Sequence, residues 1–232
     1  MVSFIAAFIA VLAASLIQGS VGIGFSFIVV PVLALVAPEL LPTAVLLLLL
    51  PLSLAIAARE RFSIDTAGLG WIIGGRIAGT ALAVPALGAF SADELRPVFG
   101  GIIVLMVAVS VSRIRIAWRP TTMTITGFMS GVFSTLAALG GPPLGVLYSS
   151  RGGSELRSTL GLTFALGLAI SLVGLLIGGQ ISQSQLIGTA RLTPALLLGF
   201  VLSRRLHGVL DQRLQPVVLA FAALVGVAAV FQ

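Results

Sequence analysis

Long apolar runs separated by short polar segments dominate this chain, and they predict membrane-spanning helices. A helix needs about 20 apolar residues to cross the ~30 Å hydrocarbon layer, and about 17 can suffice. Runs of this kind recur along both halves of the sequence. The predicted spans are 43–58, 67–88, 97–112, 158–178, 185–203 and 214–231.

Two further apolar segments, 2–36 and 121–149, are interrupted by glycine. The interruptions lie at 18–24 in the first segment and at 139–143 in the second. Each segment is either one kinked crossing or a hairpin that enters the membrane and returns to the same face. The arm that follows the first break, about 18 Å long at 1.5 Å per residue, is too short to cross comfortably, which favours the hairpin.

The two halves of the chain repeat each other, which indicates an internal duplication. We therefore predict a membrane repeat at 1–115, a basic linker at 116–120 and a second membrane repeat at 121–232. The spacing is close to 116 residues and drifts only slightly between landmarks. The aligned pairs are Gly24 with Gly140, Thr43 with Thr159, Arg76 with Arg191, and Pro97 with Pro216.

Composition agrees with an all-α polytopic membrane protein. Hydrophobic residues make up 58% of the 232 positions and charged residues only 9%, against roughly 25% in soluble domains. The absence of cysteine excludes disulfides and thiolate chemistry. The net charge of +6 comes from arginines that lie singly or in short groups between apolar runs, so it indicates membrane orientation and not nucleic-acid binding.

The arginine distribution chooses between the two topologies. If each broken segment crosses once, the loop arginines divide almost evenly between the two faces. If each forms a hairpin, every loop arginine except Arg96 lies on one face, as the positive-inside rule requires. The hairpin topology makes the two halves inverted relative to each other, as in many secondary transporters. It places both termini outside a cell inner membrane.

Arg76 and Arg191 are the strongest functional candidates. Each lies inside an apolar span, roughly 9–14 Å from the boundary, at equivalent positions of the two halves. A guanidinium in hydrocarbon is costly and normally faces a protein interior or a watery cavity. The alternative is that the side chain extends to the lipid headgroups. No carboxylate lies within the spans, so we predict a small anionic substrate as the counter-charge of both arginines.

The glycine breaks supply the remaining candidates for substrate binding. Irregular backbone at membrane depth survives only against protein or a water-filled cavity, so we expect the two breaks to meet near mid-membrane. The helix after Gly24 offers N–H groups at Phe25, Ser26 and Phe27, and helix N-termini attract anions. Besides the arginines, the predicted substrate-binding residues are Gln18, Ser20, Gly22, Gly24, Phe25, Ser26, Ser134, Thr135, Gly140, Gly141 and Pro142.

The energetics favour export. No Asp, Glu or His lies within a predicted span to relay protons, and no catalytic residue, metal site or cofactor is predicted. An exported negative charge gains about 2.3 kcal/mol per 100 mV of inside-negative potential. Three alternatives stay open: a membrane enzyme using Ser130 with the distant His207, a non-transporting scaffold subunit, and a cation or metal permease. The sequence also leaves a homo-oligomer open.

The glycine-rich segment 19–24 followed by Pro31, together with its second copy at 127–131 and 140–142, resembles the TauE/SafE family of sulfite-exporter-like permeases. Leucine- and alanine-rich helices that begin at Thr43 and Thr159 match the family as well, and the resemblance covers essentially the whole chain. It implies an anion permease for sulfite, sulfonates or related carboxylates. The family's first motif usually reads G-x-G-G-G, whereas here Phe25 and Ser26 follow Gly24, so no single anion is selected.

Overall fold

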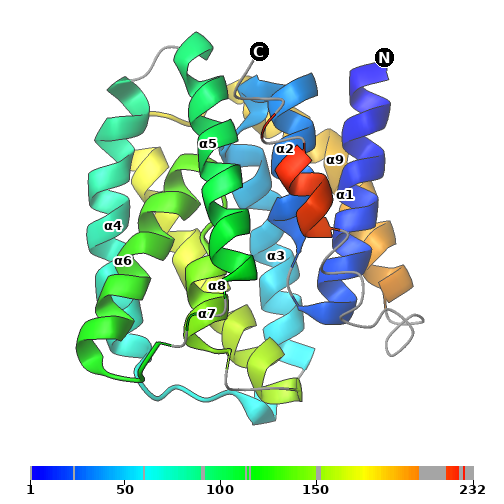
Figure 1. Cartoon of the computed structure of the whole chain (residues 1–232). Coiled ribbons are helices and arrows are strands. Elements are labelled where there is room, and N and C mark those ends of the chain that lie inside the picture. The colour runs from blue at the N-terminus through cyan, green and yellow to red at the C-terminus, as the bar shows by residue number, and fades with distance from the viewer. Residues whose placement is uncertain are drawn as a thin grey trace.

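The computed structural model is helical throughout the part that it describes, which is residues 2–22, 24–59, 61–89, 92–112, 114, 116–149, 153–203, 218–224 and 227 (Figure 1). Residues 218–224 belong to a C-terminal helix. The other helices are α1 (Val2–Val21), α2 (Phe25–Val36), η1 (Pro38–Leu40), α3 (Thr43–Arg59), η2 (Arg61–Ser63), α4 (Leu69–Ala89), α5 (Ala92–Val111), α6 (Pro120–Ala137), α7 (Gly141–Leu147), α8 (Gly153–Ile177) and α9 (Gln183–Ser203).

The predicted spans correspond closely to observed helices. Helices α3, α4, α5 and α9 begin and end within about five residues of the predicted bounds, and α8 begins five residues earlier than expected. Four described helices, α1, α4, α8 and α9, are long and apolar enough to cross a membrane. The last predicted span, 214–231, lies largely outside the described residues.

The first break is short and depends on two glycines. Helix α1 continues to Val21, so helical structure covers part of the predicted interruption. Gly22 has φ 91° and Gly24 has φ 130°, a region that side chains with a Cβ rarely adopt. The chain thereby reverses direction within three residues and begins α2 at Phe25.

The second break ends α6 with a left-handed residue. Ala138 has φ 55°, and its N–H group donates to the carbonyls of Phe133 and Ser134. The N–H group of Leu139 also donates to Phe133, so the last carbonyls of α6 are satisfied as in a Schellman motif. Helix α7 then begins at Gly141 with two prolines in its first turn, where missing N–H groups cost least.

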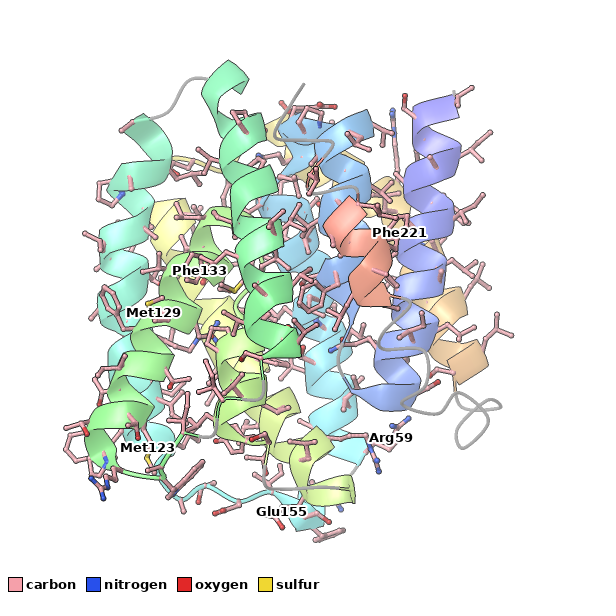
Figure 2. All side chains as sticks on the ribbon, in the orientation of Figure 1. Arg59, Met123, Met129, Phe133, Glu155 and Phe221 are labelled. Carbon is pink, nitrogen blue, oxygen red and sulfur yellow. The ribbon has the colours of Figure 1, made fainter. Side chains whose placement is uncertain are left out.

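Contacts place the starts of α6 and α8 at one end of the bundle. The loop that follows η2 reaches both helices: the Asp65 N–H group donates to Thr159 of α8 at 3.0 Å, and Gly68 packs against Met123 of α6. Figure 2 shows Met123, Glu155 and Arg59, the last residue of α3, near this same end. The α6–α7 pair therefore enters the bundle and returns to the end from which it came.

The α1–α2 pair opens at the opposite end. The Gln185 side chain near the start of α9 donates to the Glu39 carbonyl at 3.1 Å, so α9 begins where α2 has just ended. Helix α1 runs parallel to α9, because Gly199 packs against Leu12 and Gly19 packs against Ser203. Both ends of the α1–α2 pair thus lie beside the start of α9, as Figure 1 shows.

Small residues bring α4 and α6 into close contact. Added β-carbons at Gly75 and Gly79 of α4 would overlap the backbone of α6, and one at Gly127 of α6 would overlap the Ile72 carbonyl. Close approach at small residues is a common way for membrane helices to associate. Gly75, Gly79 and Gly127 therefore form a small-residue interface, whereas Gly74 faces open space.

Widening this contact should destabilise the protein. We expect Gly79→Val to lower the free energy of unfolding by about 1–3 kcal/mol, because its side chain would overlap the Phe128 carbonyl. Gly74→Ala is the control, since no heavy atom lies within 4 Å of an added Cβ there. Thermal unfolding in detergent distinguishes the two variants. Equal midpoints for Gly79→Val and the wild type would contradict this packing.

The outer surface of the bundle is strongly apolar. Large hydrophobic side chains are exposed along α1, α4, α8, α9 and other helices, a distribution typical of a surface that faces lipid. Together with the four long apolar helices, this surface identifies a multi-pass membrane protein. The exposed residues include Ile9, Leu54, Trp71, Leu82, Val173, Leu176, Leu197, Leu198 and Val201.

Candidate functional site

A cavity lies where the two helix breaks meet. Its volume is about 40 Å³, counted as the space open to the centre of a water-sized sphere. A cavity of this size suits a small ion. Helices α1, α2, α3, α4, α6, α7 and α8 contribute to its wall. The lining residues are Gln18, Gly24, Phe25, Ser26, Phe27, Leu49, Arg76, Ser134, Ala138, Leu139, Gly140, Gly141, Pro142, Phe164 and Leu168.

Arg76 of α4 is the charged residue of this wall. Its side chain is 1% exposed and lies against Gly167 of α8, where an added Cβ would overlap the guanidinium. Nη1 donates to the Ser130 hydroxyl at 2.8 Å. Nε is buried without a hydrogen-bond partner. Within the described residues, the guanidinium therefore has one neutral partner and no carboxylate.

Ser130 links Arg76 to the second break. Its hydroxyl accepts from Arg76 and donates to the Gly140 carbonyl. Gly140 approaches so closely that an added Cβ would lie 2.6 Å from the Ser130 carbonyl oxygen. This hydroxyl orients the guanidinium and fixes the turn before α7. The His207 that a serine nucleophile would need lies outside the described residues.

Gln18 organises the first break in the same way. Its side-chain N–H group donates to the Gly22 carbonyl at 3.0 Å, and its Oε1 accepts from the Phe25 N–H group at 3.1 Å. The expectation that the Phe25 N–H group is free at the helix N-terminus is therefore wrong. The first N–H group of a helix lacks a partner within the helix, and the Gln18 amide oxygen supplies that partner for α2.

The cavity brings together most of the predicted binding residues. It includes Arg76 and positions from both breaks, as expected for two breaks that meet inside the bundle. Ser20, Gly22, Thr135 and Arg191 are not among the lining residues. The predicted residues that do line it are Gln18, Gly24, Phe25, Ser26, Arg76, Ser134, Gly140, Gly141 and Pro142.

Ser20 and Thr135, two of the predicted residues away from the cavity, make other hydrogen bonds inside the bundle. The Ser20 hydroxyl donates to the Leu16 carbonyl of its own helix at 2.9 Å, as serine in a helix often does. Thr135 lies in a buried chain of hydroxyls, 3.1 Å from the Thr80 oxygen and 2.9 Å from that of Ser171. This chain joins α4, α6 and α8 one helical turn beyond Arg76.

Arg191 corrects the expectation that the two arginines share one interior. Its side chain is exposed on α9 and does not reach the cavity wall. The other copy lacks the glycine that makes room for Arg76, because Gly167 corresponds to Leu52 at the 115-residue spacing of the two arginines and to Pro51 at the 116-residue spacing. At the spacing of the arginines, Ser130 corresponds to Ser15, whose hydroxyl donates to the Val11 carbonyl of its own helix at 2.6 Å.

Sequence reasoning missed the apolar residues of the cavity wall and two residues that position Arg76. Leu49 of α3 and Phe164 and Leu168 of α8 line the cavity, but apolar residues carry no signal in so apolar a chain. Ser130 and Gly167 contact the guanidinium directly. A small residue that is present in only one of the two repeats is the signal that could have identified Gly167.

Residues 7–229 match the family model described as sulfite exporter TauE/SafE. The chain belongs to the TauE/SafE family. The resemblance seen in the glycine motifs is thus confirmed, and this TauE/SafE protein is a multi-pass membrane protein of a transporter family. No curated protein and no solved structure gives a significant match.

Proposed function

We propose that this protein is a permease that exports a small anion, such as sulfite, an organosulfonate or a related carboxylate. The observation that carries the proposal is the buried Arg76 guanidinium on the wall of the cavity, with Nε unpaired. A buried charge without an ionic partner is expensive in a membrane protein and marks a substrate pathway. A planar guanidinium also matches the geometry of oxyanions.

The substrate would bind between the two hairpin tips. Arg76 supplies the positive charge, and Gln18, Ser26 and Ser134 supply neutral polar atoms near it. Arg191 is assigned no contact with substrate in this arrangement, because its side chain is exposed on α9. It reaches the lipid headgroups or the water beyond them, as arginine side chains at such depth can.

The packing supports two inverted halves that alternate between outward and inward openings. Helix α4 packs chiefly against α6, and its repeat equivalent α9 packs chiefly against α1, the equivalent of α6. Helices α3 and α8, which are equivalent to each other, pack together between them. Hairpins that open at opposite ends fit this relation. A relative rotation of the repeats would expose the cavity to each side in turn.

The charged ends support an orientation in the inner membrane. Arg59, Arg61, Arg119 and Arg157 lie at the end where the α6–α7 hairpin opens. The positive-inside rule assigns this end to the cytoplasm. The N-terminus then lies outside, and the predicted outside position of the C-terminus falls beyond the described residues. With the inside negative, an anion leaves the cell down its electrical gradient without a coupling ion.

A flux assay on reconstituted protein tests the proposal. Liposomes loaded with sulfite or methanesulfonate should release the anion faster with the protein than without it, and a valinomycin-imposed potential, negative inside, should accelerate release. Acceleration by potential is expected because an uncoupled anion carries its charge outward. If correctly folded protein releases every anion tested no faster than protein-free liposomes do, the scaffold alternative is favoured.

A further inference from the structure

The cavity has one full positive charge. Arg76 is the only titratable side chain among the described residues that line it. The side chains that face the guanidinium from the packed helices, Ser130 on α6 and the bare backbone of Gly167 on α8, are neutral. The charge of the site is therefore set by one guanidinium, which stays protonated at every physiological pH.

Helix ends add less than a second charge. The N-terminus of α2 contributes roughly half an elementary charge at most, and its first N–H group, at Phe25, is already bonded to Gln18. The other break offers fewer donors, because Pro142 and Pro143 have no N–H group. The described wall thus falls short of two positive charges.

The rest of the described wall carries no charge. Its polar residues, Gln18, Ser26 and Ser134, are neutral, and Phe27, Leu49, Phe164 and Leu168 are apolar. A second negative charge on a bound ion would have no counter-charge in the described wall, and a buried uncompensated charge is strongly unfavourable. An anion with a single charge avoids that cost. Its charge pairs with Arg76, and its apolar or protonated group faces the apolar residues of the wall.

We infer that the cavity selects singly charged anions and rejects dianions of similar size. The selected class comprises sulfonates, monocarboxylates and the protonated, singly charged form of sulfite, whereas sulfate and fully deprotonated sulfite are disfavoured. This inference rests on the proposed function, because it specifies the charge state of the ion that binds at Arg76.

Equilibrium competition at neutral pH tests the inference on the purified full-length protein. Methanesulfonate and sulfate differ in charge but present a similar oxyanion face. We expect methanesulfonate to displace labelled methanesulfonate at a concentration at least about tenfold lower than sulfate, because the second charge of sulfate stays uncompensated. Equal or tighter binding of sulfate would overturn the inference and leave the anion permease intact. Binding of neither ion would overturn both.

The pH dependence of flux gives a second test. Sulfite gains a proton near neutral pH, whereas methanesulfonate keeps one charge throughout. Sulfite flux at constant total concentration should rise as the pH falls through that protonation step, in proportion to the singly charged form. Methanesulfonate flux should stay level. Sulfite flux that rises with pH would contradict the selection of single charges.

A charge added to the wall should change the selectivity. Ser26 lines the cavity and is only partly buried, so it can accept a longer side chain. We expect Ser26→Lys to improve sulfate binding relative to methanesulfonate by about tenfold, since the site then offers two positive charges. Ser26→Met is the control of similar length without charge. An unchanged ratio of the two affinities in Ser26→Lys would overturn the inference.

Discussion

Replacing Arg76 with glutamine is expected to reduce anion flux about 10- to 100-fold, because hydrogen bonds to a charged group are worth roughly 1.5–3 kcal/mol. The substitution removes the charge from the cavity wall, while an amide can still bond the Ser130 hydroxyl that Nη1 contacts at 2.8 Å. The measurement is anion release from liposomes that contain equal amounts of folded protein.

The repeat supplies a matched control for this substitution. Arg191→Gln changes the same residue type at the equivalent position of the other half, but the side chain is exposed. Its flux should stay within about twofold of the wild type, as for most surface substitutions. Arg76→Lys keeps the charge and loses the planar fork, so intermediate flux is expected. Wild-type flux in Arg76→Gln would remove this residue from the transport mechanism.

Gly167→Ala is expected to reduce flux at least about tenfold without changing any charge, by displacing the guanidinium that would otherwise pair with the anion. An added β-carbon would overlap Cζ and Nε of Arg76, so the side chain must leave its present position. Alanine is a better helix former than glycine by about 1 kcal/mol. The propensity of α8 to form a helix is thus not reduced, and the effect is confined to the contact with Arg76.

Gly101→Ala on α5 is the control for the added methyl group, because no heavy atom lies within 4 Å of a Cβ there. It should transport like the wild type. Flux by the two variants is compared at equal amounts of monodisperse protein. If Gly167→Ala retains wild-type flux, the position of the guanidinium against α8 does not matter for transport, and the site geometry described above is wrong.

The helical elements were predictable because the bilayer restricts the possible solutions. Spans need long apolar runs, and backbone turns inside the membrane need protein or water around them. Gly22 and Gly24 adopt positive φ, so the first break is encoded by residue type. The second break was placed slightly late, because Ala138 takes a left-handed conformation that favours glycine.

The two arginines show where a sequence repeat misleads. Equivalent positions in α4 and α9 predict equivalent roles, but burial depends on neighbours from other helices. Arg76 meets Ser130 and Gly167, whereas the side chain of Arg191 is exposed and the other repeat has Pro51 or Leu52 in place of Gly167. Function can diverge between repeats through such partners while the arginine itself is retained.

The apolar half of the cavity was beyond sequence reasoning. Leu49, Phe164 and Leu168 are ordinary residues in a chain that is 58% hydrophobic. Their role follows only from the way α3 and α8 cross beside the two breaks. The inferred selectivity for singly charged anions relies on this wall. It therefore depends on tertiary packing that leaves no local sequence motif.

Anomalous diffraction from crystals soaked in selenite, the heavier congener of sulfite, tests the central claim most directly. We expect a selenium peak between the two breaks, within about 4 Å of the Arg76 guanidinium, that disappears in Arg76→Gln. A peak beside Arg191, or a peak in the cavity that persists in Arg76→Gln, would contradict the account, as would an empty cavity under conditions that saturate transport.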